Sequence, residues 1–297
     1  MSVNLGHLIT AMITPFDEHN RVNYEMAVTL GNHLIKNGTD CILASGTTGE
    51  CPTLTHEEEF LLFEVLVHEL NVPIMAGTGS NCTATAISST QKAESYGVAA
   101  SLQVVPYYNK PTQEGIYLHF KAIAGNTALP ILLYNIPGRT GVNMEPETMA
   151  RLSEIHNIIG VKEASGDLAQ VSKIRDLTGD NFLIYSGDDA LTVPILERGG
   201  NGVVSVASHI AGLPMKEMIL SFYEGDIDKA DSMSALLNPL FKGLFETSNP
   251  ILLKAAMIMM GFEVGVPRLP LIEATHDEKV KLRALLEASN IPLVNVN

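Results

Sequence analysis

One lysine stands in an apolar stretch of the chain, where a buried β-strand is expected to end. Lys162 follows the apolar residues 158–161 and precedes the polar loop 164–167. Burying an ammonium group costs several kcal/mol unless the group is paired with an anion or loses its proton. A neutral lysine amine is a nucleophile that condenses with a carbonyl carbon to form a Schiff base. Lys162 is therefore a candidate catalytic residue, and a structural ion pair with Asp188 or Asp189 is the alternative.

The same end of other predicted strands carries side chains suited to a carbonyl substrate. Thr47 and Thr48 lie between two glycines in a turn that could bind a small carboxylate, or they serve only the hydrogen bonds of the turn. Tyr134 ends another strand, where a phenol can relay a proton to or from a bound carbonyl. Arg139 follows in the next loop and could hold a carboxylate in a bidentate manner, although a lone loop arginine is more often part of a surface ion pair.

Three further loops have more than one interpretation. Tyr107 and Tyr108 place two phenols after a predicted strand, at the mouth of the site or in simple packing. The glycine-bearing segments 186–189 and 202–205 could form a phosphate site. The acidic pair in the first of these segments opposes a phosphate dianion and is more simply a helix N-cap, while a divalent ion on it is a minor alternative.

The elements that must position these residues repeat along the chain. Short apolar runs alternate with segments of helical periodicity, as in a parallel sheet built from βα units. The expected strands are residues 8–14, 40–44, 73–76, 99–105, 130–134, 158–162, 182–185 and 202–206. The expected helices between them are residues 24–37, 56–70, 83–96, 112–125, 145–154, 168–178, 189–197 and 213–223.

Eight such units that close on themselves predict the α/β class and a (β/α)8 TIM barrel. An open doubly wound sheet is the alternative, but the first βα turn lacks the Gly-x-Gly-x-x-Gly fingerprint. After Gly225 the alternation stops, and helices are expected at 226–246, 249–261 and 276–289. We therefore expect a catalytic barrel at residues 1–225 and a small C-terminal helical domain at residues 226–297.

Composition excludes several classes of protein. The 297 residues are 46% hydrophobic and 18% charged, which is enough apolar sequence for a large core. A net charge of -14 disfavours nucleic acids and anionic membrane surfaces as partners. The three widely spaced cysteines, the absence of an apolar leader and the absence of a bilayer-length apolar run indicate a cytoplasmic protein. Scattered histidines without His-Glu-x-x-His spacing predict no metal site.

Seven motifs occur in order over essentially the whole chain. They are TAMITPF at 10–16, GTTGE at 46–50, AGTGSN at 76–81, PYYNKP at 106–111, YNIPGRTG at 134–141, VKEASGD at 161–167 and SGDD at 186–189. Together they resemble the dihydrodipicolinate synthase family, which belongs to the pyruvate-dependent class I aldolases together with N-acetylneuraminate lyase.

The resemblance implies roles for individual residues. The catalytic residues would be Lys162 as the Schiff-base lysine, Tyr134 as the proton relay, Thr47 as its hydrogen-bonding partner, and Tyr108 contributed across a dimer interface. The substrate-binding residues would be Thr48 for the pyruvate carboxylate, Arg139 for the carboxylate of aspartate semialdehyde, and Gly187 and Val204 through backbone carbonyls.

The reaction implied by the resemblance is the condensation of pyruvate with L-aspartate 4-semialdehyde, in the pathway to lysine and diaminopimelate, with no cofactor or metal. A homo-oligomer, most simply a dimer of dimers, is expected. Three alternatives remain, namely a lyase acting on N-acetylneuraminate or a keto-deoxy sugar, a non-catalytic binding or regulatory paralogue, and an unrelated phosphate-binding barrel enzyme.

A regulatory pocket is also implied, but only in part. In lysine-inhibited members of the family, the residues that bind lysine match Glu50, His56, Asn81 and Tyr107. This chain has Glu59 in place of a second histidine and Thr85 in place of a glutamate that binds the lysine ammonium. Loss of such a charge-assisted bond costs about 1.5–3 kcal/mol. We therefore expect weak or no inhibition by lysine.

Overall fold

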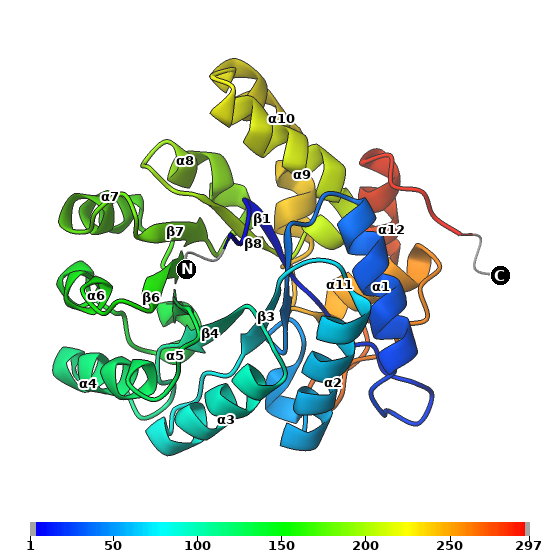
Figure 1. Ribbon diagram of the computed structural model, residues 1–297. Coiled ribbons are helices and arrows are strands. Elements are labelled where there is room, and N and C mark those ends of the chain that lie inside the picture. Colours follow the sequence, from blue (N-terminus) through cyan, green and yellow to red (C-terminus); the bar gives the residue numbers. More distant parts are fainter. Residues whose placement is uncertain (1–3, 295–297) are drawn as a thin grey trace.

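Eight parallel strands close into a barrel in the computed structural model, which describes residues 4–294 (Figure 1). Each strand pairs with its neighbours in chain order, and β1 pairs with β8 to complete the ring. The strands are β1 Leu8–Ala11, β2 Cys41–Ala44, β3 Ile74–Gly77, β4 Ala100–Val104, β5 Ile131–Asn135, β6 Ile158–Glu163, β7 Leu183–Ser186 and β8 Gly202–Ser205. The predicted TIM barrel is therefore confirmed, and the doubly wound sheet is excluded.

Helices surround the barrel, and several begin at side chains that satisfy free backbone amides. The helices between strands are α1 Tyr24–Lys36, α2 His56–Glu69, α3 Thr83–Ser95, α4 Gln113–Ala124, α5 Pro137–Thr140, α6 Pro146–Ser153, α7 Leu168–Leu177 and α8 Thr192–Leu196. Thr55 and Glu58 form a reciprocal capping box at the start of α2, and Asp167 accepts two amide hydrogen bonds at the start of α7. These local signals explain why helix starts were predictable from the sequence.

Several element bounds differ from those expected. The first strand ends at Ala11 rather than at residue 14, and the expected helix at 189–197 is a 3-10 turn followed by the short α8. The four-residue helix α5 was not expected. The helix α9, Ser208–Tyr223, begins five residues early and is broken at Ala211, where φ is -120° and ψ is 36°.

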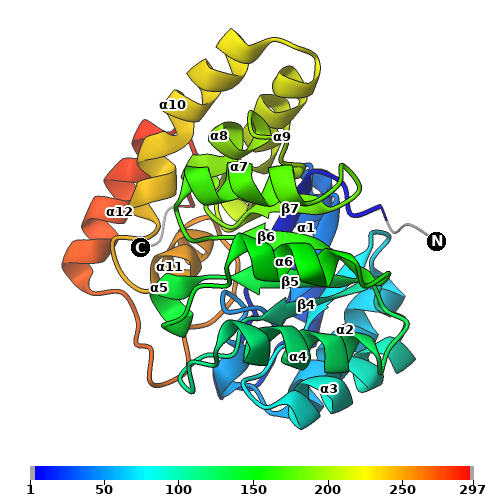
Figure 2. The ribbon, with the colours of Figure 1, turned by 90° about the vertical axis from the view of Figure 1, so that its left-hand side faces the viewer.

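The C-terminal helices pack against one side of the barrel (Figure 2). They are α10 Ile227–Gly243, α11 Ile251–Met259 and α12 His276–Ala288, close to the expected ranges. Their buried apolar residues share one cluster with residues of β1, β8 and α9, including Leu8, Val203 and Met215. The division of the chain into two domains at residue 225 stays a prediction.

The barrel interior is a separate apolar cluster that includes Leu43, Met75, Leu132 and Tyr185. Among residues 4–294, no helix is long and apolar enough to cross a membrane. Cys41, Cys51 and Cys82 are free thiols. Because the barrel interior is apolar, the predicted catalytic and substrate-binding residues lie at its rim, where the strand ends meet the loops.

Candidate active site

Lys162 lies on β6 near its carboxyl end, with only 7% of its surface exposed. It is in register with Tyr134 on β5 and with Tyr185 on β7. Burial is the main cause that lowers the pKa of the Lys162 amine to about 8, and the positive charge of Arg139 lowers it further. The negative charge of Asp189 acts in the opposite direction. A substantial share of this amine is therefore neutral near pH 8.

A second buried lysine shows what a structural ion pair looks like in this protein. Lys254 on α11 forms an ion pair with Glu50, with 2.6 Å between Nζ and Oε1, and both side chains are almost completely buried. Within residues 4–294, Lys162 forms no such pair with Asp188, Asp189 or any other carboxylate. The alternative of a structural ion pair at Lys162 is therefore wrong, and its amine is free for chemistry.

Tyr134 lies directly beside this amine. The Nζ atom of Lys162 is 4.1 Å from the centroid of the Tyr134 ring. Burial raises the pKa of the Tyr134 phenol well above its usual value, with Arg139 opposing the shift. The phenol is therefore protonated at neutral pH, and it can donate a proton or a hydrogen bond to a group formed at Lys162.

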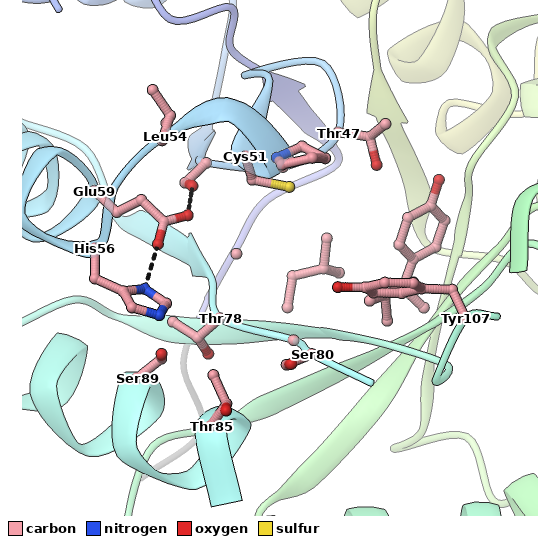
Figure 3. A pocket seen from close by; sticks show the side chains of 18 of the residues that line it. Thr47, Cys51, Leu54, His56, Glu59, Thr78, Ser80, Thr85, Ser89 and Tyr107 are labelled. Atoms are coloured by element: carbon pink, nitrogen blue, oxygen red, sulfur yellow. Dashed lines mark hydrogen bonds and ion pairs between the residues drawn. The ribbon is translucent and has the colours of Figure 1, made fainter. Parts of the chain in front are cut away.

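A cavity of about 330 Å³ is lined by Tyr134 but not by Lys162 itself. Its lining includes Thr47, Tyr134 and Arg139, so three of the predicted catalytic and substrate-binding residues meet in one cavity. Thr47 comes from the loop after β2, and Arg139 from α5. Figure 3 shows Thr47 and Tyr107 at one end of the cavity and Glu59 and His56 at the other. The cavity therefore borders Tyr134, whose ring centroid is 4.1 Å from the Nζ atom of Lys162.

Neither Gly187 nor Val204 lines the cavity, and Gly187 lies against the lysine segment. A Cβ atom at Gly187 would lie 2.6 Å from Ala164 Cβ and 3.2 Å from Lys162 Cε, so a side chain there would collide with the lysine segment. Val204 is buried on β8 in the same interior cluster as Tyr134. The absence of a side chain at Gly187 therefore leaves room for the Lys162 side chain.

Thr48 and Tyr108 have opposite environments. Thr48 is buried, and its Oγ1 accepts a hydrogen bond of 2.8 Å from Asn249 Nδ2. Tyr108 is 90% exposed and has a φ of +73°, an unusual value for a residue with a side chain. Within one chain, Tyr108 is therefore not placed in the cavity, in contrast to Tyr107.

The loops after β7 and β8 form an internal contact. Asp189 Oδ2 accepts hydrogen bonds from the amides of Val206, at 3.2 Å, and Ala207, at 2.9 Å. These amides belong to the position where barrels of this kind often bind phosphate, and a carboxylate of the chain itself satisfies them. Asp188 accepts from the amide of Ala190 at 2.9 Å, as expected for an N-cap. The prediction of a phosphate site is therefore not supported.

Metal ligands do not cluster in the part of the chain that the structure describes. Within residues 4–294, no group of three or more His, Cys, Asp or Glu side chains is arranged to hold a metal ion. The carboxylates of Asp188 and Asp189 bind backbone amides of the chain, as described above.

The residues of the expected regulatory pocket are divided by the structure. His56 and Tyr107 line the cavity together with Glu59 and Thr85. Glu50 does not, because its carboxylate points to Lys254. Asn81 lies next to the cavity, where its side chain donates to the backbone carbonyl of Tyr107 at 3.2 Å.

Sequence reasoning missed three residues of the C-terminal region that hold the loop after β2. Asn249 binds Thr48, Lys254 binds Glu50, and the backbone amide of Arg268 donates to Glu50 Oε2 at 2.9 Å. A signal was present for Lys254, which interrupts an apolar run just as Lys162 does. No local signal marked Asn249 or Arg268, because their partners lie about 200 residues earlier.

A (β/α)8 barrel with an unpaired, partly neutral lysine at a strand end is the arrangement of a class I aldolase-type enzyme. Over residues 4–289 the chain matches the model of the Dihydrodipicolinate synthetase family. It is 50% identical over 293 residues to the 4-hydroxy-tetrahydrodipicolinate synthase of Desulforudis audaxviator. The aligned region covers 98% of this chain and 100% of that relative. The chain therefore belongs to the Dihydrodipicolinate synthetase family.

Solved structures are similar over the same length. A dihydrodipicolinate synthase from Bacillus anthracis has a TM-score of 0.95 and 46% sequence identity, with 98% of this chain and 100% of that chain covered. The enzyme from Cyanidioschyzon merolae, solved with lysine bound, also has a TM-score of 0.95 and 46% identity, with 97% and 99% covered. The similarity therefore includes the C-terminal helices as well as the barrel.

Proposed function

We propose that the protein condenses pyruvate with L-aspartate 4-semialdehyde to give 4-hydroxy-tetrahydrodipicolinate, in the cytoplasm, as a step toward lysine and diaminopimelate. The observation that carries the proposal is the buried Lys162 amine, which has a lowered pKa, no ion-pair partner among residues 4–294, and the Tyr134 phenol beside it. Membership of the Dihydrodipicolinate synthetase family supports the choice of substrates.

The first half of the reaction activates pyruvate. The neutral Lys162 amine attacks the keto carbon, and loss of water gives an iminium ion. The iminium withdraws electrons, so a methyl proton leaves and an enamine forms. Tyr134 and Thr47 transfer the protons, because both line the cavity next to the amine. Thr48 binds the carboxylate of pyruvate, and the backbone carbonyls of Gly187 and Val204 face the bound molecule.

The second half forms the carbon–carbon bond. The enamine carbon attacks the aldehyde carbon of aspartate semialdehyde, and the resulting alkoxide takes up a proton. The amine of the substrate then attacks the iminium carbon, which closes the six-membered ring and releases Lys162. Arg139 binds the carboxylate of this second substrate, because its guanidinium lines the cavity and has no ion pair among the described residues.

Tyr108 completes the proton relay from a second copy of the chain. Within one chain its side chain points into solvent. A neighbouring copy that buries Tyr108 would remove this exposure and bring a third hydroxyl to the relay. We therefore propose a homo-oligomer, most simply a dimer of dimers.

Reductive trapping tests the function. Pyruvate and borohydride should add a reduced pyruvyl group to Lys162, and Lys162→Ala should abolish this trapping and lower turnover by several orders of magnitude. Lys254 is a matched internal control, because burial also lowers its pKa to about 8 but its amine is paired with Glu50. Labelling of Lys254, or of no lysine, would contradict the mechanism.

Substitution of Arg139 separates the proposed reaction from other reactions of the same class. Arg139→Ala should still be trapped by pyruvate on Lys162 at a pH above the inflection, and it should strongly reduce condensation with aspartate semialdehyde, because only the second substrate brings a carboxylate to that position. Normal condensation by this variant, or faster cleavage of N-acetylneuraminate than condensation by the unmodified enzyme, would contradict the choice of substrates.

A further inference from the structure

One hydrogen bond joins the proposed pyruvate-binding loop to the C-terminal helical region. Asn249 Nδ2 donates to Thr48 Oγ1 at 2.8 Å, and 201 positions separate the two residues. Both side chains are buried, with 5% of Thr48 and 6% of Asn249 exposed. Loss of this hydrogen bond would destabilise the folded protein, because a buried amide without a partner loses its hydration without compensation.

This bond determines what the Thr48 hydroxyl can do. A threonine hydroxyl has one proton to donate and two lone pairs that accept. The amide of Asn249 occupies one lone pair, so the hydroxyl proton must point elsewhere. Within residues 4–294, no protein group accepts this proton. A hydroxyl that already accepts a hydrogen bond is also a stronger donor, because hydrogen bonds in a chain polarise one another.

The segment that carries Asn249 is anchored to the same loop by neighbouring residues. Asn249 precedes Pro250, the N-cap of α11, and Lys254 in the first turn of that helix forms the buried ion pair with Glu50. Residues 249–254 therefore contact the loop after β2 at two positions, Thr48 and Glu50. The backbone amide of Arg268 adds a third contact at Glu50 Oε2.

The loop itself has a backbone that needs such support. Ser45 and Glu50, at its two ends, have φ values of +54° and +59°. Residues with side chains are uncommon in this region of φ, and the surrounding structure must stabilise them there. The contacts from Asn249, Lys254 and Arg268 supply this support from outside the barrel.

We propose that Asn249 is a positioning residue for pyruvate, which acts by directing the Thr48 hydroxyl proton toward the carboxylate of the substrate. The inference rests on the proposed function and assigns part of the substrate recognition to the C-terminal helical region. The affinity for pyruvate therefore depends on Asn249, which lies outside the barrel strands and their loops.

The experiment measures pyruvate binding directly, as the pyruvate concentration that gives half-maximal borohydride trapping of Lys162, together with the KM values of both substrates. Asn249→Ala should raise the half-trapping concentration and the KM for pyruvate about tenfold, the effect of one lost hydrogen bond to a charged group. The KM for aspartate semialdehyde should stay unchanged. Asn249→Asp keeps the shape but accepts the Thr48 proton and repels the carboxylate, so its effect should be larger.

A double substitution separates positioning from a general structural role. If Asn249 acts through Thr48, the double variant Asn249→Ala with Thr48→Val should bind pyruvate no more weakly than Thr48→Val alone. Asn157→Ala is the matched control, because Asn157 is a buried asparagine whose amide donates to three backbone carbonyls away from the cavity. This control should lower Tm without changing the half-trapping concentration.

Two results would overturn the proposal. One is an Asn249→Ala enzyme with unchanged half-trapping by pyruvate and a lowered Tm, as in the Asn157 control. The other is a fully additive double variant. Failure of the proposed function itself would be seen separately, because the unmodified enzyme would then not be trapped on Lys162 or would not condense the two substrates.

Discussion

At the scale of single residues, Lys162 and Lys254 differ in their partners rather than in their burial. Burial lowers the pKa of both amines to about 8. Lys254 has the carboxylate of Glu50 at 2.6 Å, whereas Lys162 has the ring of Tyr134 at 4.1 Å. The Lys254 amine is bound to the Glu50 carboxylate, so it is not available to attack a carbonyl carbon. The proposed chemistry therefore depends on one buried lysine that has no ion-pair partner among residues 4–294.

The rate of pyruvate trapping should follow the ionisation of Lys162. Only the neutral amine attacks, so the rate should rise about tenfold per pH unit below pH 8 and level off above it. An unperturbed lysine would give an inflection near its ordinary pKa of 10.5. Stopped reactions with a short borohydride pulse from pH 6.5 to 10 measure this profile. A rate that still rises about tenfold per pH unit up to pH 10 would contradict the lowered pKa.

Two substitutions should move this inflection in opposite directions. The charge of Arg139 lowers the pKa of Lys162, so Arg139→Ala should shift the inflection to higher pH. The charge of Asp189 raises it, so Asp189→Asn should shift the inflection to lower pH. Shifts of the same sign in both variants would show that the field at the amine has another source.

At the scale of elements, α11 and the loop after β2 act as one unit. The loop carries Thr47 and Thr48, and α11 with the two residues before it contributes Asn249 and Lys254. Arg268 extends the contact to α2, where its guanidinium binds Glu58 at 2.6 and 2.8 Å. Segments distant in the sequence therefore fix the geometry of the proposed carboxylate site.

Breaking the buried ion pair should destabilise this unit. Lys254→Met leaves Glu50 buried without a counter-charge, which typically costs about 3–5 kcal/mol of unfolding free energy. Replacing both partners, as Lys254→Met with Glu50→Leu, should recover a large part of that loss, because no isolated charge remains. Chemical denaturation measures both values. Equal destabilisation of the single and the double variant would contradict an isolated-charge origin of the loss.

One part of the cavity is lined by residues of α2 and α3, and this part corresponds to the expected pocket for regulation by lysine. Glu59 accepts from Ser45 Oγ at 2.5 Å, and its other oxygen is 3.0 Å from His56 Nδ1 (Figure 3). Burial raises the pKa of Glu59 above its usual value. Its carboxylate therefore already has two partners, and Thr85 contributes a hydroxyl but no charge.

Free lysine should consequently inhibit the enzyme weakly or not at all. The missing charge-assisted bond at Thr85 corresponds to about 1.5–3 kcal/mol, or roughly ten- to a hundredfold in affinity. Thr85→Glu should restore some inhibition, since it returns a carboxylate to that wall of the cavity. An activity titration with lysine decides the matter, and half-inhibition of the unmodified enzyme at submillimolar lysine would contradict the prediction.

At the scale of the whole molecule, one proposed catalytic residue lies outside the site of its own chain. Tyr108 is 90% exposed and Tyr107 beside it is 42% exposed, whereas Thr47 and Tyr134 line the cavity. Large exposed aromatic residues next to a site are typical of an interface. We therefore propose that a second copy of the chain completes the relay.

Hybrid oligomers should test this arrangement. Tyr108→Phe and Lys162→Ala chains should each be strongly impaired alone, because each lacks one part of every site. A mixed dimer would contain one site with both intact residues, so mixing under exchange conditions should restore part of the activity. Absence of complementation, with subunit exchange verified by differently tagged chains, would argue that each chain forms its own site.

The order of strands and helices was predictable because each βα unit carries its own periodicity and caps. The short helix α5 was missed because four residues give no periodic signal. The start of α9 was placed too late because the break at Ala211 interrupts the helical pattern. Local sequence patterns therefore determined the architecture, and the misplaced bounds fall where the backbone departs from regular geometry.

The sequence by itself determined the barrel, the lysine at the end of β6 and the family, because motifs and periodicity are local properties of the chain. Only the tertiary structure decided which buried lysine is unpaired, since the same pattern of a lysine in an apolar run describes both Lys162 and Lys254. It also decided that Glu50 points away from the cavity and that Asn249 binds Thr48. Such pairings depend on side-chain direction and on contacts across about 200 residues, and neither is encoded in local spacing.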